Sequence, residues 1–207
     1  MYLFRNGLIR CLEVLNKQSP LRKNVRVRMP KYSKNINLLV TNEMVQSMLD
    51  KATNLRDKFL VAMLNFSGAR PDELTRLRKK DMIQREDGCL EIKLHTDKLG
   101  KTDQEFVISD RTLTMKPDMQ FFHIVYTYWA TSNDDFLLSL TVRRIEQIIA
   151  QLSDGQLMPY NFRHSRLTKL ARMGATIDQL MYWKGAKDPR SVGAYLRGKR
   201  VEFDKIE

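Results

Sequence analysis

The sequence predicts a mainly α-helical fold that contains a small antiparallel β-sheet. Over most of the 207 residues, apolar side chains recur at spacings of three and four, which is the period of amphipathic helices. The stretch from residue 82 to residue 108 instead combines short β-favouring runs with turn signals at Glu86-Asp87-Gly88 and at residues 97–101. The length allows one well-buried domain with a short appendage.

The first 37 residues differ from the rest of the chain. Apolar residues recur at helical spacing over residues 6–16, which predicts one short amphipathic helix. Residues 17–37 contain two prolines, seven lysines or arginines and little apolar periodicity, as expected of an extended basic linker. We therefore divide the chain into residues 1–37, an N-terminal helix and linker, and residues 38–207, the main domain.

The main domain begins with two capped helices. Thr41 and Asn54 can each accept a hydrogen bond from the first turn of a helix, and apolar residues at helical spacing follow both. Leu74 and Leu77 indicate a further short helical turn. Strands are then expected at residues 82–84, 89–94 and 105–108, and later helices at residues 119–128, 141–152, 162–173 and 177–183.

The charge of the chain indicates a polyanionic partner. Lys and Arg total 36 and Asp and Glu total 24, which gives a formal net charge of +12 spread along the whole sequence. The chain shows no secretory signal and no apolar run of membrane-spanning length. We therefore expect a soluble, intracellular, cytoplasmic protein that binds nucleic acid and no membrane. A structural nucleic-acid binder has the same charge pattern.

Two arginines and a tyrosine carry the most specific chemical signal. Arg70 lies in Gly-Ala-Arg-Pro-Asp-Glu-Leu at residues 68–74, and Arg163 in Tyr-Asn-Phe-Arg-His at residues 160–164. Tyr195 follows near the C-terminus, ahead of a basic segment. Two guanidinium groups can bind the non-bridging oxygens of one phosphodiester while a phenol attacks its phosphorus.

In this order and spacing, the three residues resemble the dispersed active site of the tyrosine recombinase, or phage-integrase, family, including its archaeal members. The resemblance covers residues 38 to about 200. It implies a site-specific recombinase or integrase that cuts and rejoins double-stranded DNA through a 3′-phosphotyrosine, as a homo-tetramer, with no metal, ATP or other cofactor. It also implies that residues 1–37 are the remnant of a DNA-clamping domain.

The resemblance implies a further role for a lysine on the turn between the second and third strands. A lysine at this place in the family protonates the leaving 5′-oxygen. Lys98 matches this position best, and Lys101 is the alternative. Without a catalytic role, either residue is an exposed turn lysine.

The sequence departs from the family at two positions. Tyr160 stands where most relatives have a histidine. Its hydroxyl can still hydrogen-bond a phosphate oxygen at the active site, but a phenol is a poor proton acceptor at neutral pH. A second histidine or tryptophan position falls either on Ala186, which has no donor, or on Trp183, which can donate its N–H to phosphate or pack in the core. These departures support an alternative, a catalytically impaired DNA-binding regulator with the same fold.

Other candidates have weaker support. His164 is expected to pack in its helix, and Tyr182 and Tyr160 are weaker rivals for the nucleophile. The chain lacks the glycine-rich motifs that bind nucleotides. Its three histidines and two cysteines have unrelated spacings, so we expect no metal site.

Overall fold

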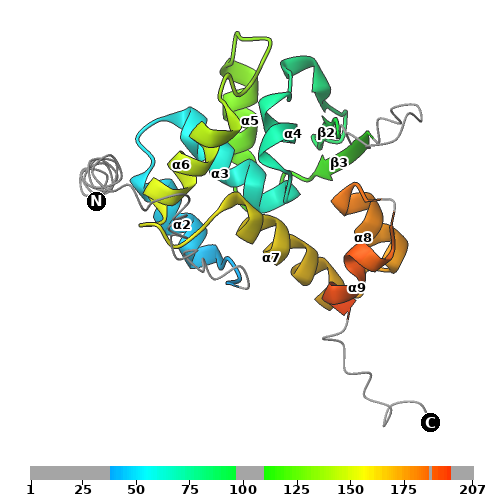
Figure 1. The fold of residues 1–207 in the computed structure, drawn as a ribbon. Coiled ribbons are helices and arrows are strands. Elements are labelled where there is room, and N and C mark those ends of the chain that lie inside the picture. Colours follow the sequence, from blue (N-terminus) through cyan, green and yellow to red (C-terminus); the bar gives the residue numbers. More distant parts are fainter. Residues whose placement is uncertain (1–37, 97–109, 187, 197–207) are drawn as a thin grey trace, which may run out of the picture. The chain divides into compact units, whose positions relative to one another are not determined.

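The computed structural model describes residues 38–96, 110–186 and 188–196. These residues form a mainly helical domain with a three-stranded antiparallel sheet at one side, so the expected fold class is confirmed (Figure 1). The N-terminal helix and linker expected over residues 1–37 lie outside the described residues. The elements are α2 (Asn42–Lys51), α3 (Leu55–Ser67), α4 (Pro71–Thr75), the 3-10 helix η1 (Lys79–Asp81), β1 (Met82–Gln84), β2 (Leu90–Leu94), β3 (Arg111–Met115), α5 (Phe122–Thr131), α6 (Val142–Leu152), α7 (Pro159–Arg172), α8 (Ile177–Lys184) and α9 (Arg190–Leu196).

Helix α3 forms the centre of the main core. It packs against α2, α5, α6 and α7, and most of its side chains are buried. The expected caps are present: Thr41 accepts a hydrogen bond from the N–H of Met44 at 3.3 Å, and Asn54 accepts one from the N–H of Asp57 at 2.8 Å. Helix α3 ends at Gly68, whose φ of 58° is in the left-handed region that glycine tolerates.

The sheet has the order β1-β2-β3, with β2 in the middle. The hairpin expected around Glu86-Asp87-Gly88 joins β1 to β2, with Met82 opposite Ile92. The third strand described is Arg111–Met115, whereas the strand expected at residues 105–108 lies outside the described residues. Strand β3 was not predicted because its first inward-facing residue, Arg111, is charged and interrupts the alternation of apolar and polar residues.

The C-terminal helices form a second, smaller core. Leu167 and Ala171 of α7 pack there with Leu180 of α8 and Val192 of α9. Helix α7 begins at Pro159, three residues earlier than expected, because proline fits the first turn of a helix. Helix α9 was not expected from the sequence. It places Tyr195 beside α7 and α8.

Candidate active site

Arg70 lies at the junction between α3 and α4. It follows the left-handed Gly68 closely and forms the N-cap of α4, and its backbone N–H donates to Glu73 Oε2 at 2.7 Å. Within the described part of the chain, its guanidinium forms no ion pair. The backbone of Arg70 is therefore fixed by a cap, while its charge remains available to a ligand.

Arg163 is held almost completely inside the protein, at 5% exposure. Its Nη1 donates to the carbonyl oxygen of Gly68 at 3.0 Å, and its Nη2 donates to the carbonyl oxygen of Lys184. Burial lowers the pKa of Arg163 to about 10; Glu73 opposes this shift, and the charge of Arg70 adds to it. Arg163 therefore remains charged at neutral pH, and the structure brings it close to Arg70.

Gly68 is required by this arrangement. A Cβ atom on it would lie 3.1 Å from the Cβ of Arg166 and 3.2 Å from the Cα of Arg163. Its positive φ also disfavours other residues. Glycine thus allows the end of α3 to approach α7, and there the carbonyl oxygen of Gly68 accepts the hydrogen bond from Arg163.

A buried ion pair between Glu73 and Arg111 lies next to both Arg70 and Arg163. Both carboxylate oxygens of Glu73 accept bonds from the guanidinium of Arg111 at 2.8 Å, and the Thr96 hydroxyl donates to the same carboxylate at 2.7 Å. Burial raises the pKa of Glu73, but the hydrogen bond and charge of Arg111 outweigh this and bring it to about 2. We did not predict this pair. The one signal for Glu73 was an acidic residue three positions after a helix N-cap.

Tyr195 lies against the N-terminal half of α7. Its ring centroid is 5.4 Å from that of His164, which in turn stacks with Tyr160 at 6.5 Å. Burial raises the pKa of the Tyr195 phenol to about 12, and Tyr160 contributes to this increase while Arg163 opposes it. Tyr195 is thus close enough to Tyr160 and Arg163 to interact with both.

The rival nucleophile Tyr182 is bound elsewhere. Its hydroxyl donates to the carbonyl oxygen of Thr112 at 2.9 Å and accepts the N–H of Thr112 at 3.0 Å. These bonds satisfy the backbone of β3, the strand at one end of the described sheet. Tyr182 therefore has a structural role that Tyr195 lacks.

Trp183 contacts the protein backbone through the group that was expected to bind phosphate. Its indole N–H donates to the carbonyl oxygen of Ser67 at 2.9 Å. The ring packs edge-on against Phe66, and the guanidinium of Arg166 lies 4.6 Å from its centroid. This arrangement favours the packing role for Trp183.

The turn lysines Lys98 and Lys101 lie outside the described residues. Thr96, two residues before Lys98, binds Glu73. This bond links the segment that follows β2 to α4, the helix that begins at Pro71. Among residues 38–96, 110–186 and 188–196, no cluster of three His, Cys, Asp or Glu side chains is suited to a metal ion, and no helix is long and apolar enough to span a membrane.

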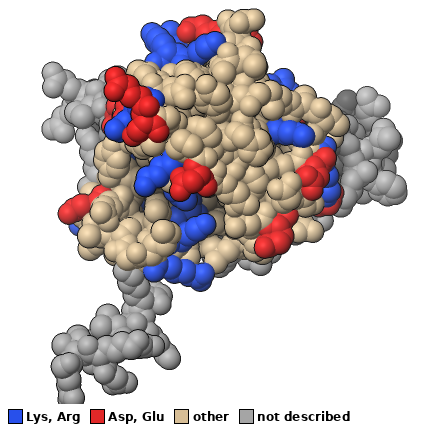
Figure 2. All heavy atoms as spheres, turned by 180° about the vertical axis from the view of Figure 1, so that it is seen from behind, with Lys and Arg blue, Asp and Glu red and all other residues tan. Residues whose placement is uncertain are grey.

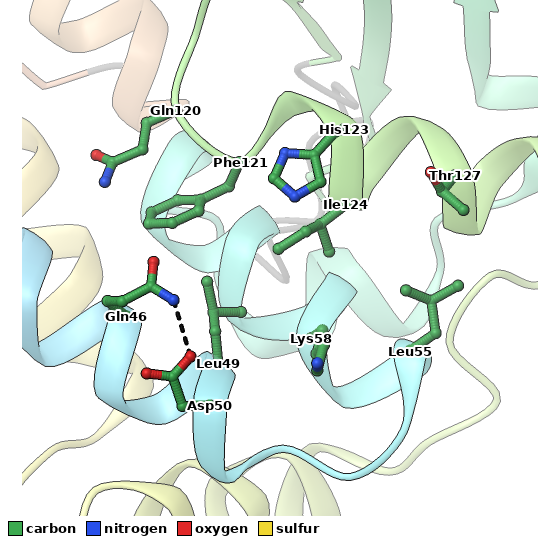
Figure 3. Close-up of a pocket in the computed structure, with 10 residues that line it drawn as sticks. All are labelled: Gln46, Leu49, Asp50, Leu55, Lys58, Gln120, Phe121, His123, Ile124 and Thr127. Carbon is green, nitrogen blue, oxygen red and sulfur yellow. Dashed lines mark hydrogen bonds between the residues drawn. The ribbon is translucent and has the colours of Figure 1, made fainter.

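A separate pocket of about 540 Å³ lies between α2, the start of α3 and α5 (Figure 3). It is lined by mixed apolar and polar side chains, including Phe121, His123 and Ile124. Along α2, on one side of the pocket, Gln46 donates a hydrogen bond to Asp50 at 2.9 Å. None of the predicted site residues lines it.

The fold matches solved structures of DNA recombinases. XerH site-specific recombinase bound to difH substrate has a TM-score of 0.58 and 20% identity, over 76% of this chain and 49% of that chain. XerA recombinase has a TM-score of 0.58 and 18% identity, over 95% and 71%. The Tn1549 transposon integrase in complex with circular intermediate DNA has a TM-score of 0.54 and 16% identity, over 81% and 64%.

The described domain therefore has the fold of tyrosine recombinase catalytic domains, as the sequence resemblance implied. The chain spans about half the length of the XerH structure. No family model and no curated protein matches the sequence.

Proposed function

We propose that this chain is a site-specific DNA recombinase or integrase that cuts and rejoins DNA through a covalent bond to Tyr195. The observation that carries the proposal is the convergence of Arg70, Arg163 and Tyr195 from α4, α7 and α9. They are far apart in the sequence, and their meeting is what a phosphoryl transfer with a phenol nucleophile requires.

The reaction proposed is an exchange of phosphodiester bonds. The Tyr195 oxygen forms a bond to phosphorus, the bond from phosphorus to the 5′-oxygen breaks, and a 3′-phosphotyrosine results. The phenol loses its proton, and the leaving 5′-oxygen gains one. Arg70 and Arg163 stabilise the charge on the non-bridging oxygens. The bond energy is retained, so rejoining needs no ATP, and the arginines neutralise the phosphate without a metal.

Three further roles complete the proposal. Lys98, with Lys101 as the alternative, donates the proton to the 5′-oxygen. Tyr160 orients the Tyr195 phenol, with which it interacts. Trp183, proposed from the sequence as a phosphate donor, is given a packing role because its N–H binds Ser67.

The proposed partner is double-stranded DNA, on which the protein assembles as a homo-tetramer. The net charge of +12 supports an anionic partner. Figure 2 shows Lys and Arg side chains gathered along part of one face, with acidic side chains beside them. The XerH and Tn1549 structures contain DNA. We further propose that residues 1–37 assist in holding the duplex.

A catalytically impaired DNA-binding regulator is the second candidate. Two observations favour it: Tyr160 replaces a proton acceptor, and neither Trp183 nor Ala186 offers an unoccupied side-chain donor in the described structure. Such a protein binds the same sites but leaves the DNA intact.

Covalent trapping separates the two candidates. A duplex pool with randomised sequence and a nick in each molecule is incubated with the full chain, and adducts that resist detergent are isolated and sequenced. The enzyme forms such adducts, because the short strand next to the nick diffuses away after cleavage. Tyr195→Phe should form none while keeping its DNA affinity, and Tyr182→Phe is the matched control that should still react. DNA binding without any adduct would favour the regulator.

A further inference from the structure

Two charged side chains, Glu73 and Arg111, lie next to Arg163 of the candidate phosphate site. Glu73 and Arg111 are almost completely buried, at 1% and 2% exposure, and bind each other through two hydrogen bonds of 2.8 Å. Arg163 lies beside them, with its Nη1 3.9 Å from Glu73 Oε2. The charges of Glu73 and Arg111 cancel, so Arg70 and Arg163 leave a net charge of +2 for this group of four residues.

Glu73 is a potential competitor of the phosphate. Its carboxylate is fully ionised at neutral pH and already lies within ion-pair distance of Arg163. Without Arg111, the carboxylate would be buried and unpaired, which is strongly unfavourable. Arg163 is the nearest remaining cation with a contact to Glu73 in the described structure.

We propose that Arg111 is a positioning residue that occupies Glu73, so that Arg163 keeps its full charge for the DNA phosphate. Arg111 is too deeply buried to touch DNA itself. Its effect is therefore indirect, through the charge and the position of Arg163. The inference rests on the proposed function and adds to it a residue on β3 that the sequence resemblance did not identify.

The surroundings of Arg111 fit this role. Its Nη1 also donates to the Thr96 hydroxyl at 2.8 Å. A Cβ atom on Gly185 would lie 2.8 Å from the same Nη1, so only glycine allows the end of α8 to approach it. The neighbouring carbonyl, that of Lys184, accepts the bond from Arg163. Arg111 thus also lies against the backbone of Lys184 and Gly185, which holds Arg163.

Two variants separate a charge role from a purely structural one. Arg111→Met removes the cation and leaves Glu73 to bind Arg163. Glu73→Gln combined with Arg111→Met removes both charges, leaves an amide oxygen to accept the N–H of Arg70, and restores two positive charges at the site. The double variant does not restore the link between α4 and β3, so a structural role predicts no recovery.

The first measurement is the rate of adduct formation on a site recovered by trapping, with a normal phosphodiester and with a neutral methylphosphonate at the scissile position. We expect Arg111→Met to be about 100-fold slower on the diester, since a preorganised charge contributes effects of this size. The loss should be at least about tenfold smaller on the methylphosphonate, whose transition state carries less charge. The double variant should recover most of the rate on the diester and the wild-type ratio of the diester rate to the methylphosphonate rate.

The second measurement is DNA affinity as a function of salt, which requires no cleavage. Arg111→Met should reduce the salt slope by about 0.9, the value for one phosphate contact, and the double variant should restore it. The inference is overturned if the double variant recovers neither quantity, or if Arg111→Met changes neither. If the salt slopes of the three proteins follow this pattern but the wild type never forms an adduct, the proposed enzyme is contradicted and the role of Arg111 is not.

Discussion

The indole N–H of Trp183 binds the carbonyl oxygen of Ser67 at 2.9 Å, so it is directed at the protein backbone at the end of α3. Ser67 is fully buried, and its carbonyl would have difficulty finding another partner. Since α3 leads directly into Arg70, this bond links α8 to the segment that positions a candidate catalytic residue.

We therefore predict that Trp183→Phe reduces stability more than chemistry. It should lower the free energy of unfolding by about 1–3 kcal/mol, the cost of leaving a buried acceptor unpaired. The adduct rate, measured well below the melting temperature, should fall by less than about tenfold. Denaturant unfolding and adduct trapping test both statements.

Trp129→Phe is the matched control. Trp129 donates its N–H to the carbonyl oxygen of Lys79 at 3.2 Å, in a different part of the domain. Its loss should affect stability similarly and leave the rate unchanged. If Trp183→Phe alone slows the reaction 100-fold while it remains folded, the indole contributes to chemistry after all.

The elements that the sequence predicted are those that local interactions determine. The helices with Thr41 and Asn54 caps and the hairpin at Gly88 were predicted because local hydrogen bonds and turn residues determine them. Glu73 and Arg111 were missed because a buried ion pair between a helix and a strand distant in sequence leaves no local pattern.

Helix α9 was missed for a different reason. It is seven residues long and contains Gly193, so its intrinsic helix propensity is low. Its formation depends on the burial of Val192 against α7 and α8. Such tertiary stabilisation cannot be inferred from spacing alone.

Tyr160 should control the acidity of Tyr195. Tyr160→Phe removes the hydroxyl that contributes to the raised pKa of Tyr195, so this pKa should fall below about 12. NMR titration of tyrosine labelled at Cζ measures the change, with Tyr126→Phe as a control for the loss of a distant phenol. An unchanged Tyr195 titration would mean that the two hydroxyls do not interact in solution.

Tyr160→His tests the same position in the opposite direction. An imidazole can accept the phenolic proton, so the adduct rate should be kept or raised and should acquire a titration near pH ~6.5. The pH profile of the parent protein is the reference. If Tyr160→Phe reacts as fast as the parent, the residue serves packing alone.

Replacing Arg70 and replacing Arg163 should have similar effects on the reaction rate but different effects on the stability of the fold. Each change to Ala should lower the adduct rate by a few powers of ten, about 3 kcal/mol or more of transition-state stabilisation. Arg163→Ala should also destabilise the fold, because the carbonyl groups of Gly68 and Lys184 lose their donor. Arg70→Ala should leave the melting temperature nearly unchanged. Equal losses of affinity and rate would identify ordinary phosphate contacts.

Lys98 and Lys101 can be distinguished by the leaving group. A 5′-thiolate leaves without a proton, so only the defect of the true general acid should be rescued by a substrate with sulfur in place of the 5′-oxygen. Lys98→Ala and Lys101→Ala are compared on both substrates, and we expect rescue of Lys98→Ala. Rescue of Lys101→Ala instead would reassign the acid, and rescue of neither would remove both from this role.

The Glu73–Arg111 pair predicts a specific loss of stability in acid. Burial raises the pKa of Glu73, but Arg111 outweighs it and lowers the pKa from 4.5 to about 2. Because the folded-state pKa is depressed, the contribution of Glu73 is fully present above pH ~4.5 and is lost as the pH falls toward about 2. Other carboxylates titrate in the same range, so the wild type alone cannot identify the source. The double variant Glu73→Gln/Arg111→Met lacks this titration. Between about pH 5 and pH 3 its unfolding free energy, measured with urea, should therefore decrease less than that of the wild type. Parallel curves for the two proteins would show that Glu73 is not held ionised by Arg111 in solution.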